Sequence, residues 1–318
     1  MHKPAYSVLH AKGLLRDRAA KGLALLENCK SCPRSCGVNR LQGEPGFCKT
    51  LRYSKVASFG PHFGEEAPLV GAHGSGTIFF SSCNLLCSFC QNSGISHLRE
   101  GDEVNAGELA GIMLDLQDRG CHNINFVTPS HVVPQILEAL VIAADAGLDL
   151  PLIYNTGGYD ALDTIRLLDG VFDIYMPDFK FWEEEPSKTF CTAPDYRETA
   201  SRAFKEMHAQ VGDLVLDTQG IAYRGLLVRH LVMPGGLAGT ERVMQFLAQE
   251  ISRNTYVNVM DQYRPCHKAE SDPRIGRRIT AAEYEDALES ARRAGIHRID
   301  SRKKVHIDLN NDKAFRST

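Results

Sequence analysis

Apolar residues follow two different periods along the middle of this chain. Short, nearly continuous apolar runs are typical of buried strands, whereas apolar residues that recur every three or four positions are typical of helices. The short runs cover residues 77–80, 123–127, 152–154, 172–176, 225–232 and 255–259. The helical stretches cover residues 105–119, 132–146, 160–168, 195–211 and 240–252. Strands that alternate with helices in this way predict a parallel sheet with helices on its outside.

Three cysteines follow the first predicted strand. Cys83, Cys87 and Cys90 have the spacing C-x3-C-x2-C within one short loop. A structural zinc site takes four protein ligands, and ordinary ferredoxin-type clusters take four cysteines. Three thiolates therefore leave one position open on a metal cluster, where a cofactor or substrate can bind. The alternative is a structural metal loop, or a redox cluster that binds no cofactor.

Four more cysteines lie near the N-terminus. Cys29, Cys32, Cys36 and Cys48 have the spacing C-x2-C-x3-C-x11-C, with glycine and proline residues among them. Four thiolates make a closed site, which fits structural zinc or a second iron–sulfur cluster, and the spacing does not separate the two. Lysines and arginines beside these cysteines favour deprotonation of the thiols.

Composition and charge narrow the class of protein. The chain has 318 residues, 43% of them hydrophobic, which is enough to bury a full core. It has no apolar stretch long enough to span a bilayer, and its start lacks the features of a secretory signal, so we expect a cytoplasmic protein. Ten cysteines in that compartment are expected to be metal ligands or free thiols rather than disulfides.

Charge is unevenly distributed along the chain. Residues 1–60 hold 11 Lys and Arg against 3 Asp and Glu, whereas the remainder holds 25 against 36. A basic N-terminal region attracts acidic partners over a distance, so it fits an acidic electron donor or a nucleic acid. A solvated helix face is the alternative explanation.

The three-cysteine loop and its flanks resemble the radical S-adenosylmethionine (SAM) superfamily. The resemblance includes Phe89 before the last cysteine, Gly76 and Phe80 before the loop, and Cys90-Gln91-Asn92 after it. These flanks are similar to the branch that contains pyruvate formate-lyase-activating enzyme. The resemblance implies a [4Fe–4S] cluster on the three cysteines that binds SAM at its open iron. Reductive cleavage of SAM would then give a 5′-deoxyadenosyl radical, which abstracts a hydrogen atom.

The resemblance also assigns roles to residues near the carboxyl ends of the predicted strands. The residues that would contact SAM or a monovalent cation are Phe89, Asn92, Thr128, Ser130, Asn155, Thr156, Met176, Asp178, Lys180, Arg229 and Gln262. The cation would lie among Asn155, Thr156, Met176 and Asp178. Arg229 would bind the SAM carboxylate, because a guanidinium matches two carboxylate oxygens. Asn155 replaces a carboxylate of the family, so a cation would bind less tightly here.

These observations predict a partial (β/α)6 barrel, of the TIM-like type that the radical SAM resemblance implies, with a Cys-rich extension. The predicted parts are a basic metal-binding extension (residues 1–60), the barrel (61–264), and a C-terminal helix and tail (265–318). A helix in the extension is interrupted by Gly22 and ends near Asn28. Residues 56–73, rich in Gly, Pro and His, predict a linker and a lid over the cysteine loop. The amphipathic helix at residues 281–294 is expected to pack across the barrel's open side.

The first functional hypothesis is an activase that installs a glycyl radical on a partner enzyme. It needs a low-potential electron donor of the flavodoxin or ferredoxin type. Two departures weigh against it, since Leu86 stands where this branch often has Arg and Thr128-Pro129 replaces a Gly-Gly-Glu motif. The second hypothesis is radical modification of a small molecule, peptide or RNA. The third is a metal-binding interaction module without catalysis.

Overall fold

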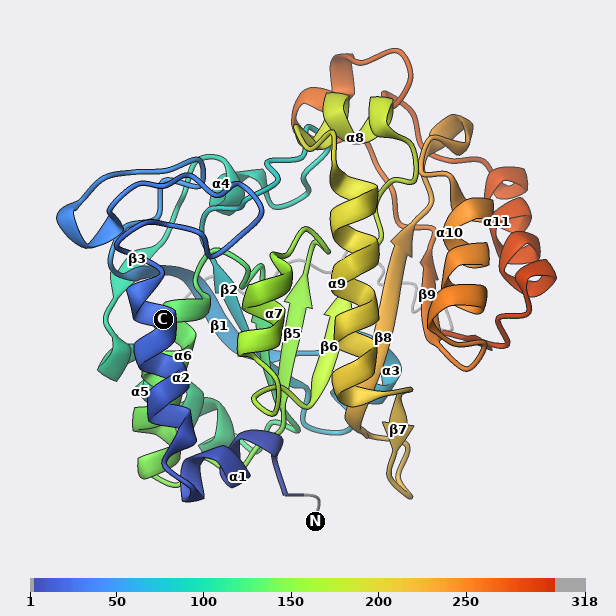
Figure 1. The fold of residues 1–318 in the computed structure, drawn as a ribbon. Helices are drawn as coiled ribbons and strands as arrows, with labels where there is room; N and C mark the ends of the chain where they lie inside the picture. The colour runs from blue at the N-terminus through green and yellow to red at the C-terminus, as the bar shows by residue number, and fades with distance from the viewer. Residues whose placement is uncertain (1–2, 301–318) are drawn as a thin grey trace, which may run out of the picture.

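Six parallel strands lie side by side at the centre of the molecule (Figure 1). Their bounds are β2 Ser75–Phe80, β4 Ile124–Val127, β5 Leu152–Thr156, β6 Ile174–Pro177, β8 Ala222–Leu231 and β9 Tyr256–Met260. Each strand pairs in parallel with its neighbour in the order β9-β8-β6-β5-β4-β2. The computed structural model that gives this fold describes residues 3–300. All six strands coincide with those predicted from the apolar runs.

The sheet has two free ends, so the barrel stays open. Beyond β2, the strands β1 Ser54–His62 and β3 Asp102–Val104 continue the sheet in antiparallel orientation. Beyond β9, the short strand β10 Arg298–Ile299 adds one more parallel pairing, and β7 Val215–Leu216 pairs only with β8. The predicted partial barrel is therefore confirmed.

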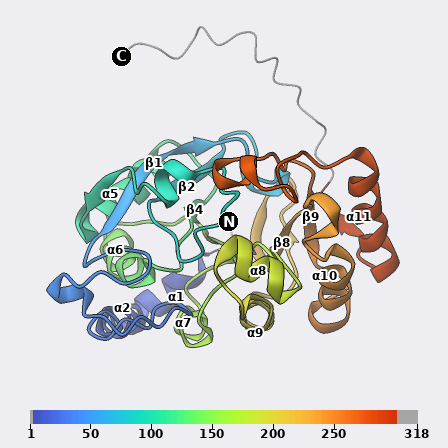
Figure 2. The same ribbon diagram turned by 90° about the horizontal axis from the view of Figure 1, so that it is seen from above.

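Helices cover the outside of this sheet, and the view from above shows them in an arc around it (Figure 2). The longer helices are α1 Ala5–Ala11, α2 Leu14–Ala24, α5 Ala106–Asp118, α6 Val133–Asp145, α7 Leu162–Leu167, α8 Glu184–Cys191, α9 Tyr196–Val211, α10 Thr240–Phe246 and α11 Ala281–Ala294. Shorter pieces are η1 Arg40–Gln42, α3 Ala67–Val70, α4 Ser93–Ser96, η2 Pro234–Gly236, η3 Leu247–Ile251 and η4 His267–Ser271. Within residues 3–300, none of the helices combines the length and the apolarity needed to cross a membrane.

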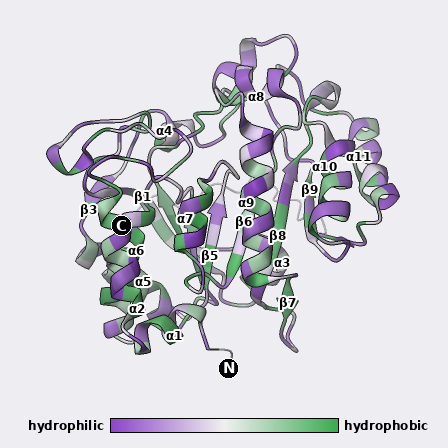
Figure 3. Ribbon diagram, in the orientation of Figure 1, coloured by the Kyte–Doolittle hydropathy of each residue, from purple (hydrophilic) through white to green (hydrophobic). Residues whose placement is uncertain are grey.

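Local sequence explains why these helices form and which face they bury. In α5, the Asn105 side chain accepts the Glu108 backbone N–H, and the Glu108 side chain accepts the Asn105 N–H, a reciprocal cap that starts the helix. In α9, Ala200, Phe204 and Met207 recur every three or four positions and are buried against the sheet. Hydrophilic and hydrophobic residues alternate around α9 in the same way (Figure 3).

The N-terminal helix is broken at a different glycine from the one predicted. Gly13 has a φ of 73° and separates α1 from α2. Gly22 lies inside α2 and is buried, because a side chain there would meet Leu137 and Pro134 of α6. This glycine permits close packing of two helices, and it does not interrupt either of them.

Residues 56–73 form a strand and the floor of the barrel, and they do not form the predicted linker and lid. His62 at the end of β1 pairs with Ser75, the first residue of β2, whereas the cysteine loop follows Phe80, the last. The segment after β1 therefore lies at the amino ends of the strands. Leu69 of α3 is buried there in an apolar cluster that includes Met176. Figure 1 shows α3 at the opposite end of the strands from α4 and α8.

The C-terminal helix also differs from expectation. α11 packs against α10 in the outer layer, with Ala287 and Ala291 buried, and does not cross the open side of the barrel. Its apolar face is short, so it covers one neighbouring helix. The predicted domain boundary at residue 60 falls within β1, and the predicted division into three parts remains a prediction.

Candidate functional site

A cavity of about 380 Å³ opens inside the barrel, on the side where the cysteine loop lies. The strands carry their side chains to it because parallel strands end at a common edge. Nine of the residues predicted for the site line this cavity: Cys87, Phe89, Cys90, Asn92, Asn155, Asp178, Lys180, Arg229 and Gln262. The structure thus brings together residues from four different strand ends and from the cysteine loop.

The thiols of Cys83, Cys87 and Cys90 lie together above this cavity. Burial raises the pKa of the Cys83 thiol to about 12, and the neighbouring thiols of Cys87 and Cys90 add to that rise. The Leu85 backbone N–H donates to Cys83 Sγ at 3.3 Å, and the Ser96 hydroxyl lies 3.1 Å from Cys90 Sγ. Metal binding must displace protons from such thiols, and hydrogen bonds to sulfur then stabilise the thiolates.

Contacts with distant segments hold the cysteine loop in shape. The Asn84 side chain donates to the Tyr159 carbonyl at 2.7 Å, and the Ser88 N–H donates to the Phe190 carbonyl at 2.8 Å. Leu86 has a φ of 51°, a left-handed conformation that turns the chain back between the first two cysteines. The loop is therefore fixed by α8 and by the segment after β5.

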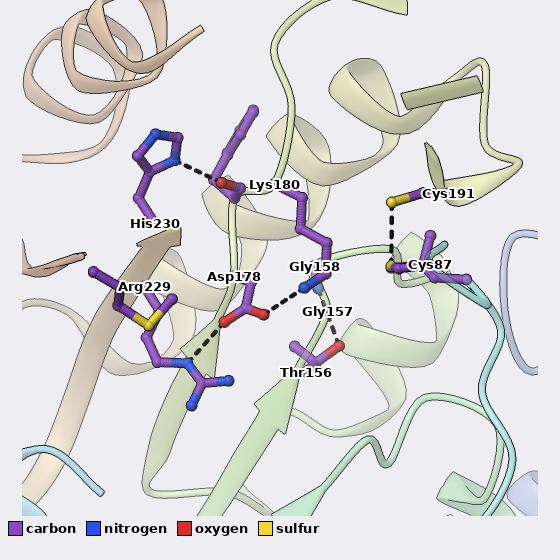
Figure 4. A network of polar contacts seen from close by, with 12 residues as sticks. Cys87, Thr156, Gly157, Gly158, Asp178, Lys180, Cys191, Arg229 and His230 are labelled. Carbon is purple, nitrogen blue, oxygen red and sulfur yellow. Dashed lines mark hydrogen bonds and ion pairs between the residues drawn. The ribbon is translucent and has the colours of Figure 1, made fainter. Parts of the chain in front are cut away.

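A fourth cysteine lies against this loop and was missed from the sequence. Cys191, at the end of α8, is fully buried, with its Sγ 3.2 Å from Cys87 Sγ (Figure 4). This contact is the main cause that raises the pKa of Cys87, and burial adds to it. No spacing motif relates the two residues, because they are 104 positions apart.

Asp178 is the centre of the polar network at the cavity wall (Figure 4). Arg229 Nε donates to Asp178 Oδ1 at 2.7 Å, and Lys180 Nζ donates to Asp178 Oδ2 at 2.6 Å. Arg229 Nη2 also donates to Asn155 Oδ1 at 2.9 Å. Asp178 directly follows β6 and continues its parallel pairing to Arg229 of β8, so the sheet itself sets this arrangement.

Opposite charges keep all three groups ionised despite their burial. Burial disfavours the carboxylate of Asp178, but Arg229 and Lys180 outweigh it and lower the pKa of Asp178. Burial likewise disfavours the charge on Lys180, but Asp178 outweighs it, so the pKa of Lys180 is raised. The pKa of Arg229 is raised for the same reason, with Glu66 and Glu65 adding to Asp178.

Five predicted site residues do not line the cavity. They are Cys83, Thr128, Ser130, Thr156 and Met176. The Ser130 hydroxyl lies 3.0 Å from the Thr156 hydroxyl, and the Thr156 hydroxyl donates to the Asp160 carboxylate. Met176 is buried in the core. Asn155 and Asp178 direct their oxygens to the Arg229 guanidinium. A monovalent cation would have to compete with that guanidinium, and it stays a prediction, as do the SAM contacts of Thr128 and Ser130.

The floor of the cavity carries an acidic pair, Glu65 and Glu66, within the segment that was predicted to form a lid. Glu65 Oε2 lies 3.9 Å from Arg229 Nη1, and Glu66 Oε1 accepts a hydrogen bond from Asn258 at 2.7 Å. His62 Nδ1 lies 2.9 Å from Glu65 Oε1. The sequence signal for this role is the pair of adjacent carboxylates, Glu65 and Glu66, in a segment otherwise rich in Gly and Pro.

The four N-terminal cysteines form a second group of thiols. Burial raises the pKa of Cys32 to about 12, and the thiols of Cys48, Cys29 and Cys36 add to the rise. Across the part of the chain that the structure describes, no three Cys, His, Asp or Glu side chains lie close enough to share one metal ion. A polynuclear cluster does not require that convergence, because each thiolate binds its own iron. Zinc and a second cluster both stay predictions for the N-terminal thiols.

The fold and site define an α/β protein with an open parallel barrel and a three-cysteine loop over a charged cavity. No protein-family model matches the chain. It is 34% identical over 280 residues to the uncharacterized protein MJ0674 of Methanocaldococcus jannaschii, an alignment that covers 86% of this chain and 76% of that protein. The chain belongs to the family of that archaeal protein, the name of which states no activity.

A solved structure was also found to be similar. It is the crystal structure of a radical SAM methyltransferase from Sphaerobacter thermophilus, with 14% sequence identity and a TM-score of 0.48. The match covers 69% of this chain and 64% of that chain, which is less than two thirds of its length. A likeness of this size defines neither a fold nor an activity.

Proposed function

We propose that this protein is a radical SAM enzyme. The observation that carries the proposal is the group of three thiols, Cys83, Cys87 and Cys90, beside a cavity lined by buried charges of both signs. These thiols would hold a [4Fe–4S] cluster with one iron left open. The cluster would supply the electron that splits SAM into methionine and a 5′-deoxyadenosyl radical.

The charges of the cavity suit a ligand that carries both signs. SAM has a carboxylate, an ammonium group and a sulfonium. Arg229 and Lys180 offer donors to a carboxylate, whereas Asp178, Glu65 and Glu66 offer acceptors to cationic and hydroxyl groups. Because all five side chains are already oriented by hydrogen bonds or ion pairs, little ordering is required when the ligand binds.

Apolar side chains cover part of the cavity wall. Phe89 is buried and packs edge-on against Phe181, and Met233 and Met260 add apolar surface. Apolar surface around a bound ligand helps to exclude water, which would otherwise compete with the substrate for a reactive radical. Gln262 is exposed at the cavity, so a substrate can reach it from that side.

Anaerobic cleavage of SAM tests the proposal. Reconstituted, reduced protein should form 5′-deoxyadenosine, and Cys87→Ala should abolish it. Cys121→Ala is the matched control, since Cys121 is also a buried cysteine but does not line the cavity. Equal product from wild type and Cys87→Ala, or none from wild type, would contradict the proposal and leave the non-catalytic metal-binding module.

For the substrate, we propose a partner enzyme that receives a glycyl radical. The support is that Asn155 and Asp178, to which the resemblance to the activating-enzyme branch assigns a role, both line the cavity. After anaerobic incubation with SAM, a candidate partner should show the doublet of a glycyl radical in electron paramagnetic resonance. Repeated turnover on a small molecule, peptide or RNA without that doublet would overturn this assignment and retain the SAM chemistry.

A further inference from the structure

We propose that Cys29, Cys32, Cys36 and Cys48 bind a second iron–sulfur cluster, which passes electrons to the cluster of the three-cysteine loop. The binding part of this proposal depends only on the N-terminal thiols. The transfer step rests on the proposed function, since it needs an acceptor cluster on the other loop. The class of cofactor is a [4Fe–4S] cluster with four cysteine ligands.

The four thiols are buried or partly buried, and a backbone N–H faces one of them. Cys29, Cys32 and Cys48 are buried, and Cys36 is partly so. The Phe47 backbone N–H lies 3.3 Å from Cys36 Sγ, in a geometry that suits donation to a thiolate.

The position of the Cys36 sulfur leaves no room for a side chain at Gly46. A side chain at Gly46 would come within 2.9 Å of Cys36 Sγ, closer than real carbon and sulfur atoms approach. The loop therefore brings its backbone directly against the thiol. Close backbone approach of this kind leaves room for N–H groups to face the sulfur.

A buried arginine balances the charge that a cluster would bring. Arg40 is only 1% exposed, and its Nη1 lies 3.9 Å from Cys29 Sγ. The same guanidinium donates to the carbonyls of Leu51 and His131. A buried cation needs nearby negative charge, and four thiolates around a cluster would provide it. The chain supplies no carboxylate contact to Arg40 among the hydrogen bonds found in residues 3–300.

The position of this loop favours a cluster over zinc. Four cysteine ligands fit either group. The contact between Arg34 and Asn84 places the loop beside the three-cysteine loop. Only a redox-active group can pass an electron between the two loops, and zinc has no redox chemistry.

One side chain links the two groups of thiols directly. Arg34, two residues after Cys32, donates through Nε to the carbonyl of Asn84 at 2.8 Å, and Asn84 adjoins Cys83. Its guanidinium also lies over the ring of Tyr159, 5.1 Å from the centroid. The two cysteine loops are therefore joined through one side chain and one hydrogen bond.

The transfer step moves one electron and no atoms. A reduced low-potential ferredoxin or flavodoxin would give one electron to a cluster held by Cys29, Cys32, Cys36 and Cys48. The same electron would then pass to a cluster held by Cys83, Cys87 and Cys90, so the first cluster would return to its oxidised state.

Metal analysis of two variants tests the binding part. Wild type, reconstituted anaerobically, should hold about eight irons and eight sulfides, as expected for two [4Fe–4S] clusters. Cys83→Ala/Cys87→Ala/Cys90→Ala should retain about four of each, with a cluster spectrum in Mössbauer spectroscopy. The same variant carrying zinc, or no metal, would overturn the second cluster without touching the proposed function.

The reciprocal variant separates the two proposals. Cys36→Ala/Cys48→Ala should retain about four irons and still cleave SAM when dithionite is the reductant. If it holds no iron while the triple variant holds four, the open cluster fails and the second cluster stands. Circular dichroism of each variant, and the single change Cys48→Ser, show whether a loss of iron comes from misfolding.

The rate of reduction tests the transfer step. In Cys36→Ala/Cys48→Ala, reduction of the remaining cluster by a protein donor should slow at least tenfold relative to wild type, as followed by rapid-freeze electron paramagnetic resonance. Reduction by dithionite, a small molecule that needs no relay, should change much less. An unchanged rate with the protein donor would overturn the relay.

Discussion

Asp178 accepts hydrogen bonds from two cationic side chains, Lys180 and Arg229, and so holds both of them at the cavity wall. Its side chain is 13% exposed, and those of Arg229 and Lys180 are 20% and 17% exposed. When one member of a buried ion pair is removed, the remaining charge stays buried without compensation. The network should therefore matter for folding as well as for ligand binding.

We expect Asp178→Asn to lower the free energy of unfolding at pH 7 by about 3–5 kcal/mol, because it leaves two buried cations without their carboxylate. Urea denaturation of the metal-free protein measures this change. Asp163→Asn is the control, since Asp163 is 96% exposed and forms only a surface pair with Arg166. Equal shifts for both variants would contradict the buried network.

The difference in unfolding free energy between wild type and Asp178→Asn should depend on pH. The pKa of Asp178 is lowered in the folded protein, so its stabilisation is complete above the unfolded value of about 3.9 and is lost as the pH falls below it. The difference between wild type and Asp178→Asn should thus be largest near neutral pH and shrink under acid conditions.

With the cluster bound as proposed, Cys191 should raise the reduction potential of that cluster. A thiol that donates to the sulfur of Cys87 stabilises the added electron, because hydrogen bonds to cluster sulfurs raise the reduction potential. We expect Cys191→Ala to lower that potential by on the order of tens of millivolts, the equivalent of one weak hydrogen bond. A redox titration monitored by electron paramagnetic resonance measures it, with Cys121→Ala as the control, and an unchanged potential would contradict the contact.

At the scale of elements, two glycines inside helices have opposite roles. A side chain at Gly22 of α2 would lie 3.1 Å from Leu137 of α6, whereas nothing lies within 4 Å of a side chain at Gly111 of α5. Both glycines weaken their helices intrinsically. Only Gly22 is compensated by close packing of the extension against the barrel.

We expect Gly111→Ala to stabilise the protein by up to about 1 kcal/mol, the ordinary gain in helix propensity. Gly22→Ala should give no such gain, and Gly22→Val should destabilise the protein because α2 must move away from α6. Thermal denaturation of the three variants makes the comparison. A gain for Gly22→Ala equal to that of Gly111→Ala would show that the two helices do not pack as closely as described.

At the scale of the whole molecule, the positive charge of the N-terminal region lies on the same part of the chain as the four-cysteine site. Lys30 and Lys49 are exposed beside Cys29 and Cys48. Small electron carriers of the ferredoxin and flavodoxin type are commonly acidic, so this surface would attract such a donor. Complementary charge raises the rate of encounter more than the final affinity.

We expect Lys30→Glu/Lys49→Glu to slow reduction by an acidic donor several-fold at low salt, and the difference from wild type should vanish at high ionic strength. Stopped-flow absorbance measures the rate. Arg253→Glu is the control, because Arg253 is exposed but lies next to β9 and far along the chain from the cysteines. An equal effect of the control would indicate a general charge effect and no local docking.

Much of the fold and part of the site could be predicted from the sequence. The six parallel strands were predicted because buried strands are continuous apolar runs. Asn155, Asp178 and Arg229, which line the cavity, were predicted from the resemblance to the radical SAM superfamily. β1 was missed, since its Gly and Pro residues resemble a loop and only Ser54 and Val56, near its start, are buried. The break in the N-terminal helix was predicted at Gly22 and lies at Gly13, because composition does not tell a bend from a close helix contact.

The order of the six parallel strands along the chain and the spacing of both groups of cysteines followed from the sequence, because they depend on residues close together in the chain. The contacts of Cys191 with Cys87, of Arg34 with Asn84 and of Glu65 with Arg229 became visible only in the folded structure. Such contacts join segments far apart in the chain. They arise from packing of the whole barrel, which no local pattern encodes.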